Sequence, residues 1–89
     1  MKVSIVGTGY VGLVTGATLA DLGNQVVCLD IAEEKINILN SGKSPIYEPG
    51  LDKLIQQGLK AKNLKGSTEI KQNIRNSDIT FICVGTPSD

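Results

Sequence analysis

The fold of this chain is decided by the stretch VSIVGTGYVG at residues 3–12. A short apolar run rich in β-branched residues comes first, and three glycines with the spacing G-x-G-x-x-G follow it. A helix-like segment begins directly after the glycines, and Asp30 ends the next strand-like run. A strand, a glycine loop, a helix and an acidic residue in this order predict a dinucleotide-binding βαβ unit. The alternative is a glycine-rich turn that binds nothing, and the helix and Asp30 argue against it.

Each of the three glycines has its own predicted task. Gly7 lets the chain leave the strand in a tight turn, and Gly9 lets the backbone approach a pyrophosphate closely. Gly12 lets the first helix pack against the sheet, and Gly16 lies on the same helix face. The pyrophosphate would lie on the free N–H groups of the helix N-terminus, where the helix dipole favours negative charge. We therefore predict that Gly7, Gly9 and Gly12 bind the cofactor.

Asp30 is placed to select the dinucleotide. Its carboxylate, about 20 positions after the glycine loop, suits hydrogen bonds from the adenosine ribose hydroxyls and would repel a 2′-phosphate. No arginine stands nearby to receive such a phosphate, and Lys35 is the only close cation. The pattern therefore favours NAD over NADP. Asp30 is equally suited to cap the helix that follows, and the two roles are compatible. By pattern alone, Lys35 is a solvated surface charge.

The rest of the chain continues the alternation of strands and helices. Strands are predicted at residues 2–6, 25–29, 64–68 and 79–84, and helices at residues 10–22 and 32–40. Further helices are predicted around Leu51 to Leu59 and around Ile70 to Ile74. The predicted fold class is α/β, a Rossmann-like three-layer fold whose parallel sheet has strand order 3-2-1-4, as a partial doubly wound domain. Thr86 would then face the glycine loop across one crevice and bond the cofactor, unless it belongs to an ordinary turn.

Length and composition restrict the classes of function. The 89 residues allow one domain, and nine basic against nine acidic side chains give no net charge. Nothing indicates a nucleic-acid partner, a membrane span or a signal peptide. Cys28 and Cys83 lie on strands that are not neighbours in the predicted sheet, so they should stay unpaired in a reduced, cytoplasmic compartment. No histidine is present and no metal site is predicted.

One segment is not required by nucleotide binding. A minimal βαβ unit would return to the sheet soon after residue 42, but the chain continues with SPIYEPGL at residues 44–51. Two prolines and a glycine indicate a rigid extended turn before the helix around residues 51–59. This insertion is therefore a candidate family-specific feature.

Four segments together resemble the UDP-glucose/GDP-mannose dehydrogenase family over the whole chain: GTGYVG at residues 7–12, Asp30, PIYEPGL at 45–51 and VGTPS at 84–88. The resemblance implies NAD-dependent oxidation of a nucleotide sugar at C6, from alcohol to carboxylate. It implies two NAD per turnover and a thiohemiacetal and thioester on a cysteine. Within the family the resemblance is greatest to members that oxidise UDP-glucose to UDP-glucuronate, with GDP-mannose and other nucleotide-sugar dehydrogenases as the alternative.

The resemblance also assigns roles to single residues. Tyr10 and Val11 match NAD contacts of the glycine loop, Asp30 and Lys35 match the adenosine-ribose side, and Thr86 matches a further NAD contact. The family's catalytic residues match no position here, so we predict none in this chain. Residues 1–89 are expected to be the N-terminal part of the NAD-binding domain, without the catalytic and UDP-binding domains. Such a fragment should be inactive alone, and the intact enzyme should be a homodimer that binds a nucleotide sugar.

Three other functions share the glycine loop. A stand-alone NAD-sensing regulatory module would explain the small size and the missing catalytic groups, but it leaves the insertion at residues 45–51 unexplained. Dehydrogenases of the 3-hydroxyacyl or 6-phosphogluconate type have no matching YEPGL segment. An FAD enzyme does not usually continue with VGTP after its fourth strand.

Overall fold

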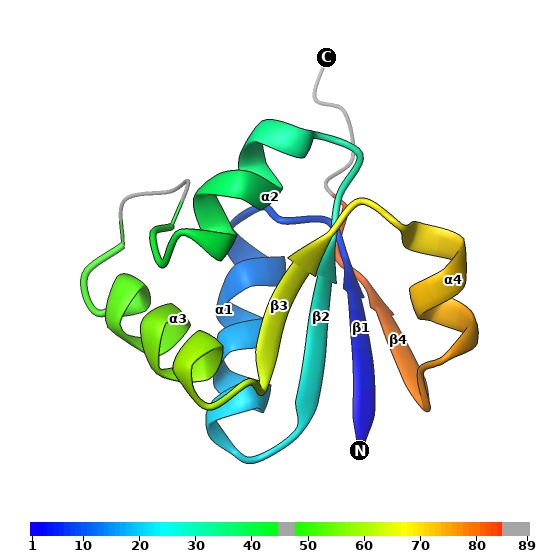
Figure 1. The fold of residues 1–89 in the computed structure, drawn as a ribbon, viewed down its shortest axis with the longest axis horizontal. Helices are drawn as coiled ribbons and strands as arrows, with labels where there is room; N and C mark the ends of the chain where they lie inside the picture. Colours follow the sequence, from blue (N-terminus) through cyan, green and yellow to red (C-terminus); the bar gives the residue numbers. More distant parts are fainter. Residues whose placement is uncertain (45–47, 85–89) are drawn as a thin grey trace.

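A computed structural model describes residues 1–44 and 48–84 of the chain (Figure 1). Four strands alternate with helices along the sequence, as the apolar periodicity predicts. The elements in chain order are β1 (Lys2–Val6), α1 (Tyr10–Asp21), β2 (Gln25–Leu29), α2 (Glu33–Asn40), α3 (Leu51–Lys60), β3 (Leu64–Ser67), α4 (Ile70–Arg75) and β4 (Ile79–Ile82).

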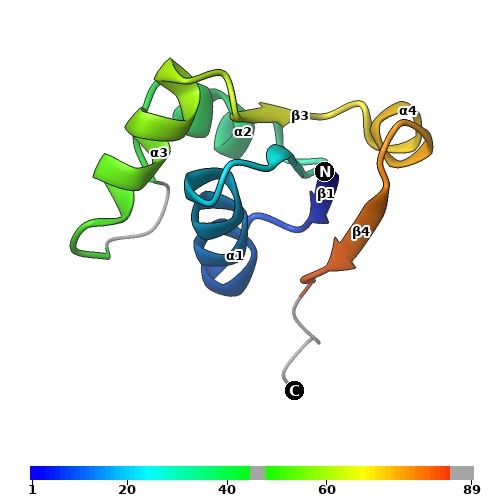
Figure 2. The same cartoon turned by 90° about the horizontal axis from the view of Figure 1, so that it is seen from below.

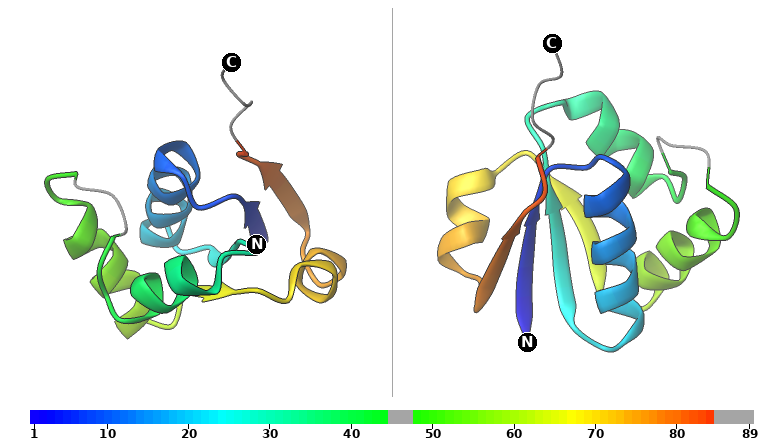
Figure 3. Two further views of the ribbon diagram at one scale, coloured as in Figure 1. Left: turned by 90° about the horizontal axis from the view of Figure 1, so that it is seen from above. Right: turned by 180° about the vertical axis from the view of Figure 1, so that it is seen from behind.

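The four strands form one parallel sheet with the order β3-β2-β1-β4. Helices α1, α2 and α3 lie on one side of this sheet and α4 lies on the other (Figures 2 and 3). The predicted three-layer α/β fold and its strand order are therefore confirmed. Parallel strands are buried on both faces in such folds, and this explains why β1 and β2 are almost continuously apolar.

Glycine at position 16 lets α1 lie directly on the sheet. A Cβ at Gly16 would stand 2.8 Å from Cys28 Sγ and 3.4 Å from Ile5 Cγ1, so α1 and the two central strands are already in contact. Val3, Ala17 and Ala20 belong to the same buried cluster. Small residues on this face of α1 are thus required by packing, in agreement with the sequence prediction.

The inserted segment contributes a helix to the same side of the molecule. Helix α3 packs against α1 and β3, and its Leu51 and Ile55 are fully part of the buried core. A Cβ at Gly58 would lie 2.8 Å from Leu64 Cβ, so the helix approaches the start of β3 as closely as a glycine allows. The described part of the insertion therefore extends the core, and its residues 45–47 lie outside the described residues.

The opposite face of the sheet is held by polar contacts. Ser4 is fully buried in the middle of β1, where an apolar side chain would be expected. Its hydroxyl donates to the Asn73 carbonyl oxygen at 3.2 Å and shares a hydrogen bond with the Ser77 hydroxyl. Because buried polar groups need partners, Ser4 ties β1 to the end of α4.

Several predicted boundaries shift by one or two residues. Strand β4 ends at Ile82 rather than residue 84, because the neighbouring chain turns away at Gly7 after the Cys83 N–H has bonded the Val6 carbonyl. Helix α4 begins after Glu69, and Ser67 supports this turn by accepting the Glu69 N–H at 3.0 Å. Ser67 lies two positions before Glu69, the N-cap residue of α4.

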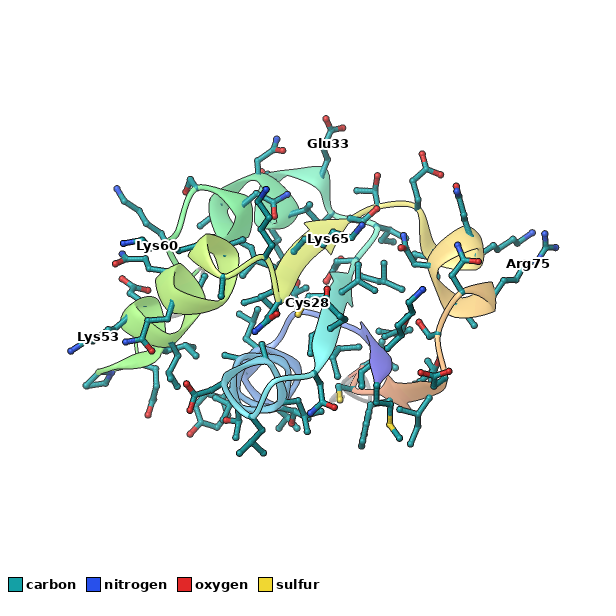
Figure 4. All side chains as sticks on the ribbon, turned by 60° about the horizontal axis from the view of Figure 1, so that its bottom comes forward. Cys28, Glu33, Lys53, Lys60, Lys65 and Arg75 are labelled. Atoms are coloured by element: carbon teal, nitrogen blue, oxygen red, sulfur yellow. The ribbon has the colours of Figure 1, made fainter. Side chains whose placement is uncertain are left out.

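The charged side chains of the helices point away from the core. Figure 4 shows Glu33, Lys53, Lys60 and Arg75 directed outward, whereas Cys28 lies between the sheet and α1. Within residues 1–44 and 48–84, no helix has the length and apolar character needed to cross a membrane.

We predict that Gly16→Val lowers the free energy of unfolding by about 1–3 kcal/mol, because added methyl groups have no space beside Cys28. Urea denaturation measures the change. Thr18→Val, at an exposed position of the same helix, is the control and should change stability by less than about 0.5 kcal/mol.

Cys28→Ala provides the decisive comparison, since it removes the atom nearest to the added side chain. The double variant should lose less stability than the two single losses added together. Strict additivity would contradict the contact between α1 and β2 described above.

Candidate dinucleotide-binding site

The glycine loop lies between the carboxyl ends of β2 and β4. Gly7 has φ +104°, and a Cβ there would stand 2.9 Å from the Cys83 carbonyl oxygen. The Gly7 N–H donates to the Leu29 carbonyl oxygen at 2.8 Å. Both its conformation and its surroundings therefore exclude a side chain at Gly7, as the tight-turn prediction requires.

Gly12 packs mainly against the backbone of the glycine loop itself. A Cβ at Gly12 would lie 2.0 Å from the Gly7 carbonyl oxygen and 3.3 Å from Cys83 Cβ. The predicted contact between α1 and the sheet belongs instead to Gly16, one helical turn further along.

Gly9 faces open space at the start of α1. No heavy atom of residues 1–44 and 48–84 lies within 4 Å of the position that a Gly9 Cβ would take, and the Gly9 φ of −74° does not demand glycine. Gly9 is the N-cap of α1, no side chain in the described part of the chain caps this helix, and no acidic residue occurs in its first turn. The first N–H groups of α1 lack intrahelical partners, so they and the helix dipole favour an anion here.

Tyr10 and Val11 flank this open helix end. Their side chains are 52% and 61% exposed, although both are large and hydrophobic. They project from the first turn of α1, beside Gly9. The loop thus combines free donors with accessible apolar surface, a combination that suits a nucleotide better than a bare phosphate ion.

The Asp30 carboxylate stands next to the loop and is held by three hydrogen bonds. Its Oδ2 accepts the Thr8 N–H at 3.1 Å and the Thr8 hydroxyl at 2.6 Å. Its Oδ1 accepts the Ala32 N–H at 2.9 Å. A carboxylate has about four acceptor positions, so Oδ1 keeps one for a further donor such as a ribose hydroxyl. The alternative prediction, that Asp30 caps α2, is wrong: the N-cap is Ala32, and Asp30 bonds the N–H of that residue and not one of the first helical turn.

The surroundings of Asp30 keep it ionised. Burial alone would raise its pKa, but the hydrogen bonds from Thr8 and Ala32 and the charge of Lys35 lower the pKa below the ordinary value of 3.8. Lys35 lies in the first turn of α2 with an exposed side chain. Asp30 and Lys35, which are predicted to flank the adenosine ribose, thus carry opposite charges that interact at the end of β2.

Two residues of this region carry no signal in the sequence pattern. Thr8 is only 1% exposed and contacts Asp30, although the glycine spacing places no demand on this position. Ile31 follows Asp30 and is 86% exposed, which leaves an apolar surface beside the carboxylate. Neither role could be predicted, because both depend on how the loop and the end of β2 meet in space.

The remaining candidates that the structure describes are the two cysteines. Thr86 lies outside the described residues. Both cysteines are free, as predicted, and burial together with the neighbouring Cys83 raises the pKa of Cys28 to about 12. Since the thiolate is the reactive form, Cys28 is inert at neutral pH. Residues 1–44 and 48–84 contain no group of three or more His, Cys, Asp or Glu side chains able to hold a metal.

A separate hollow lies at the other end of the sheet. It has a volume of about 340 Å³ and is lined at the amino ends of the strands by residues including Lys2, Gln25 and Asn73. The glycine loop and Asp30 take no part in it. In a parallel α/β sheet, ligands bind at the carboxyl ends of the strands, which favours the glycine loop as the functional site.

Comparison with known proteins identifies the family. Residues 1–89 match the UDP-glucose/GDP-mannose dehydrogenase family, NAD binding domain. The chain belongs to this family. The predicted membership is thereby confirmed, and the dinucleotide of the matched domain is NAD.

Individual relatives are named as dehydrogenases of different nucleotide sugars. The chain is 49% identical over 88 residues to GDP-mannose 6-dehydrogenase of Pseudomonas aeruginosa, covering 99% of this chain and 20% of that protein. It is 50% identical over 86 residues to UDP-glucose 6-dehydrogenase TuaD of Bacillus subtilis, covering 97% of this chain and 19% of the relative.

Similar solved structures likewise include dehydrogenases of different nucleotide sugars. A ternary complex of GDP-mannose dehydrogenase from Pseudomonas aeruginosa matches with a TM-score of 0.96 and 48% identity, over 100% of this chain and 20% of that one. A UDP-glucose dehydrogenase from Pyrobaculum islandicum matches with a TM-score of 0.93 and 35% identity, over 99% of this chain and 20% of that one. The chain thus spans about a fifth of the length of its relatives.

We predict that Gly9→Val abolishes most NAD binding and leaves the fold intact. The added side chain would enter the open space at the α1 N-terminus, where a Cβ has no described heavy atom within 4 Å. Calorimetric titration should show NAD affinity reduced at least about tenfold, a loss of about 1.4 kcal/mol. The free energy of unfolding should change by about 1 kcal/mol or less, the usual cost of replacing an N-cap glycine.

Thr18→Val serves again as the control, since it adds no bulk near the loop. Unchanged NAD affinity in Gly9→Val would contradict the placement of the ligand at the start of α1.

Proposed function

We propose that this chain is the N-terminal part of the NAD-binding domain of a nucleotide-sugar dehydrogenase. In the intact enzyme it would serve the NAD-dependent oxidation of a nucleotide sugar such as UDP-glucose or GDP-mannose to the corresponding uronate. The observation that carries the proposal is the uncapped α1 N-terminus beside the ionised Asp30 carboxylate, at the carboxyl ends of parallel strands. Family membership over residues 1–89 supports it.

The residues present fit the dinucleotide part by part. The open space at Gly9 and the free N–H groups of α1 suit the pyrophosphate. The remaining acceptor position of Asp30 suits a hydroxyl of the adenosine ribose, with Lys35 beside it. The exposed Ile31 offers an apolar surface to the adenine ring. Tyr10, Val11 and Thr86 are proposed as further contacts, on the grounds of the family resemblance.

The carboxylate also accounts for the choice between the two nicotinamide dinucleotides. NADP carries a phosphate on the adenosine ribose 2′ position, and that phosphate would meet the negative charge of Asp30. Among the described residues, Lys35 is the cation that acts on the Asp30 carboxylate. Burying an unpaired phosphate next to an ionised carboxylate is strongly unfavourable, so the site discriminates against NADP.

This chain's own residues bind and orient the cofactor, and we propose that none of them is catalytic. Bound NAD supplies the acceptor for a hydride from the sugar. Cys28 is buried with a pKa of about 12, which makes it unsuited to attack a substrate. The relatives are about five times as long as this chain, which leaves room for the catalytic and nucleotide-sugar-binding domains in the rest of such a protein. Residues 1–89 should therefore be inactive alone.

The nucleotide sugar itself is a separate question. The identity is 49% to a GDP-mannose 6-dehydrogenase and 50% to a UDP-glucose 6-dehydrogenase, so the NAD-binding region favours neither substrate. The physical reason is that both reactions use the same cofactor, and the residues of this region serve that cofactor. UDP-glucose, the substrate that the sequence resemblance favoured, is thus one candidate beside GDP-mannose and other nucleotide sugars.

The test is a calorimetric titration of the chain with NAD and with NADP, alongside Asp30→Ala. We expect NAD to bind at least about tenfold more tightly than NADP, and Asp30→Ala to remove most of this preference. Asp21→Ala removes an equal charge from an exposed position at the end of α1 and is the matched control. It should keep the preference for NAD.

The proposal fails if the folded chain binds neither dinucleotide. It also fails if NADP binds as well as NAD to the unsubstituted chain, since Asp30 would then play no part in selection.

A further inference from the structure

Thr8 is the one buried polar residue of the glycine loop, with 1% of its surface exposed. It is the middle residue of the first G-x-G, a position for which the dinucleotide-binding spacing requires no residue type. Both of its donors, the backbone N–H and the side-chain hydroxyl, bond the same oxygen, Asp30 Oδ2. The residue therefore connects the loop that follows β1 with the end of β2.

We propose that Thr8 is a positioning residue, which acts through Asp30 to orient the carboxylate that receives the adenosine ribose of NAD. The inference rests on the proposed function, because it concerns the same cofactor. It assigns to the loop a second task besides holding the pyrophosphate.

The geometry of the three hydrogen bonds supports the proposal. Thr8 donates twice to Oδ2, and the Ala32 N–H holds Oδ1 at 2.9 Å, so the carboxylate plane is set from two sides. Rotation of the Asp30 side chain would break at least one of these bonds. The acceptor position that remains on Oδ1 is thus presented in a fixed direction, which reduces the entropy lost when a ribose hydroxyl binds.

The hydroxyl is the strongest of the three donors. Its distance of 2.6 Å falls in the range of charge-assisted O–H···O⁻ bonds, which are about twice as strong as neutral ones. Valine has nearly the same shape as threonine but lacks this donor, whereas serine keeps it. The pair of substitutions therefore separates the hydrogen bond from the packing.

The titration of Asp30 gives a readout that packing alone would not move. Burial raises the pKa of this carboxyl, and the Thr8 hydroxyl is the foremost of the contacts that lower it. Lys35 on α2 is the charged side chain that acts on Asp30 in the described part of the chain. Removing the hydroxyl should therefore raise the pKa of Asp30, while Lys35 and the backbone donors stay in place.

The experiment uses Thr8→Val and Thr8→Ser, each with and without Asp30→Ala, in the 89-residue chain. Calorimetry with NAD should show a loss of affinity of about 10- to 100-fold for Thr8→Val, the usual range for a hydrogen bond to a charged group. Thr8→Ser should stay within about threefold of the unsubstituted chain. In the Asp30→Ala background, Thr8→Val should cause no further loss, since Thr8 would have nothing left to position.

A second measurement requires no ligand. An NMR titration of the Asp carboxyl groups should place the pKa of Asp30 higher in Thr8→Val than in the unsubstituted chain and in Thr8→Ser. If Thr8→Val does not fold, Thr8→Ala, which also lacks the donor but occupies less volume, replaces it in both measurements.

Two outcomes would overturn the inference while the proposed function stands: an unchanged Asp30 pKa in Thr8→Val, or the same loss of NAD affinity with and without Asp30→Ala. Absence of NAD binding by the folded, unsubstituted chain would instead refute the proposed function, and the inference with it.

Discussion

The structure depends on one steric constraint, the close approach of the glycine loop to the ends of its neighbouring strands. Gly7 lies against the Cys83 carbonyl, and the first turn of α1 lies against the Gly7 carbonyl at a point where Gly12 has no room for a Cβ. Because backbone meets backbone at both contacts, the start of α1 is held at the carboxyl end of β1. The free N–H groups of the helix therefore point to the place where β2 also ends.

This arrangement brings opposite electrostatic features together within one short region. The uncapped helix end attracts an anion, and the Asp30 carboxylate accepts hydroxyl donors and repels phosphate. A molecule with a pyrophosphate next to an unphosphorylated ribose satisfies both requirements. Thr8 belongs to the loop and donates a hydrogen bond to Asp30. The conformation of the loop therefore fixes the direction of the carboxylate.

The sequence predicts most of the fold because its signals are local. Apolar β-branched runs mark the strands, and Gly23 and Gly42 end helices with positive φ, as their positions suggest. What the sequence does not predict depends on contacts between distant residues. Ser4 is buried through α4, and Thr8 meets Asp30 only because the loop folds back over β2. The nucleotide sugar is unpredictable for another reason, since the residues proposed here to bind a ligand serve the cofactor.

The most direct test of this account is an amide NMR spectrum of the chain titrated with NAD. The largest shifts are expected at residues 8–12 and 30–35, where the helix N-terminus and the Asp30 carboxylate meet. The shifts at both segments should follow a single binding curve. The account is contradicted if NAD shifts only the amides around Lys2, Gln25 and Asn73 at the opposite end of the sheet, or if it shifts none.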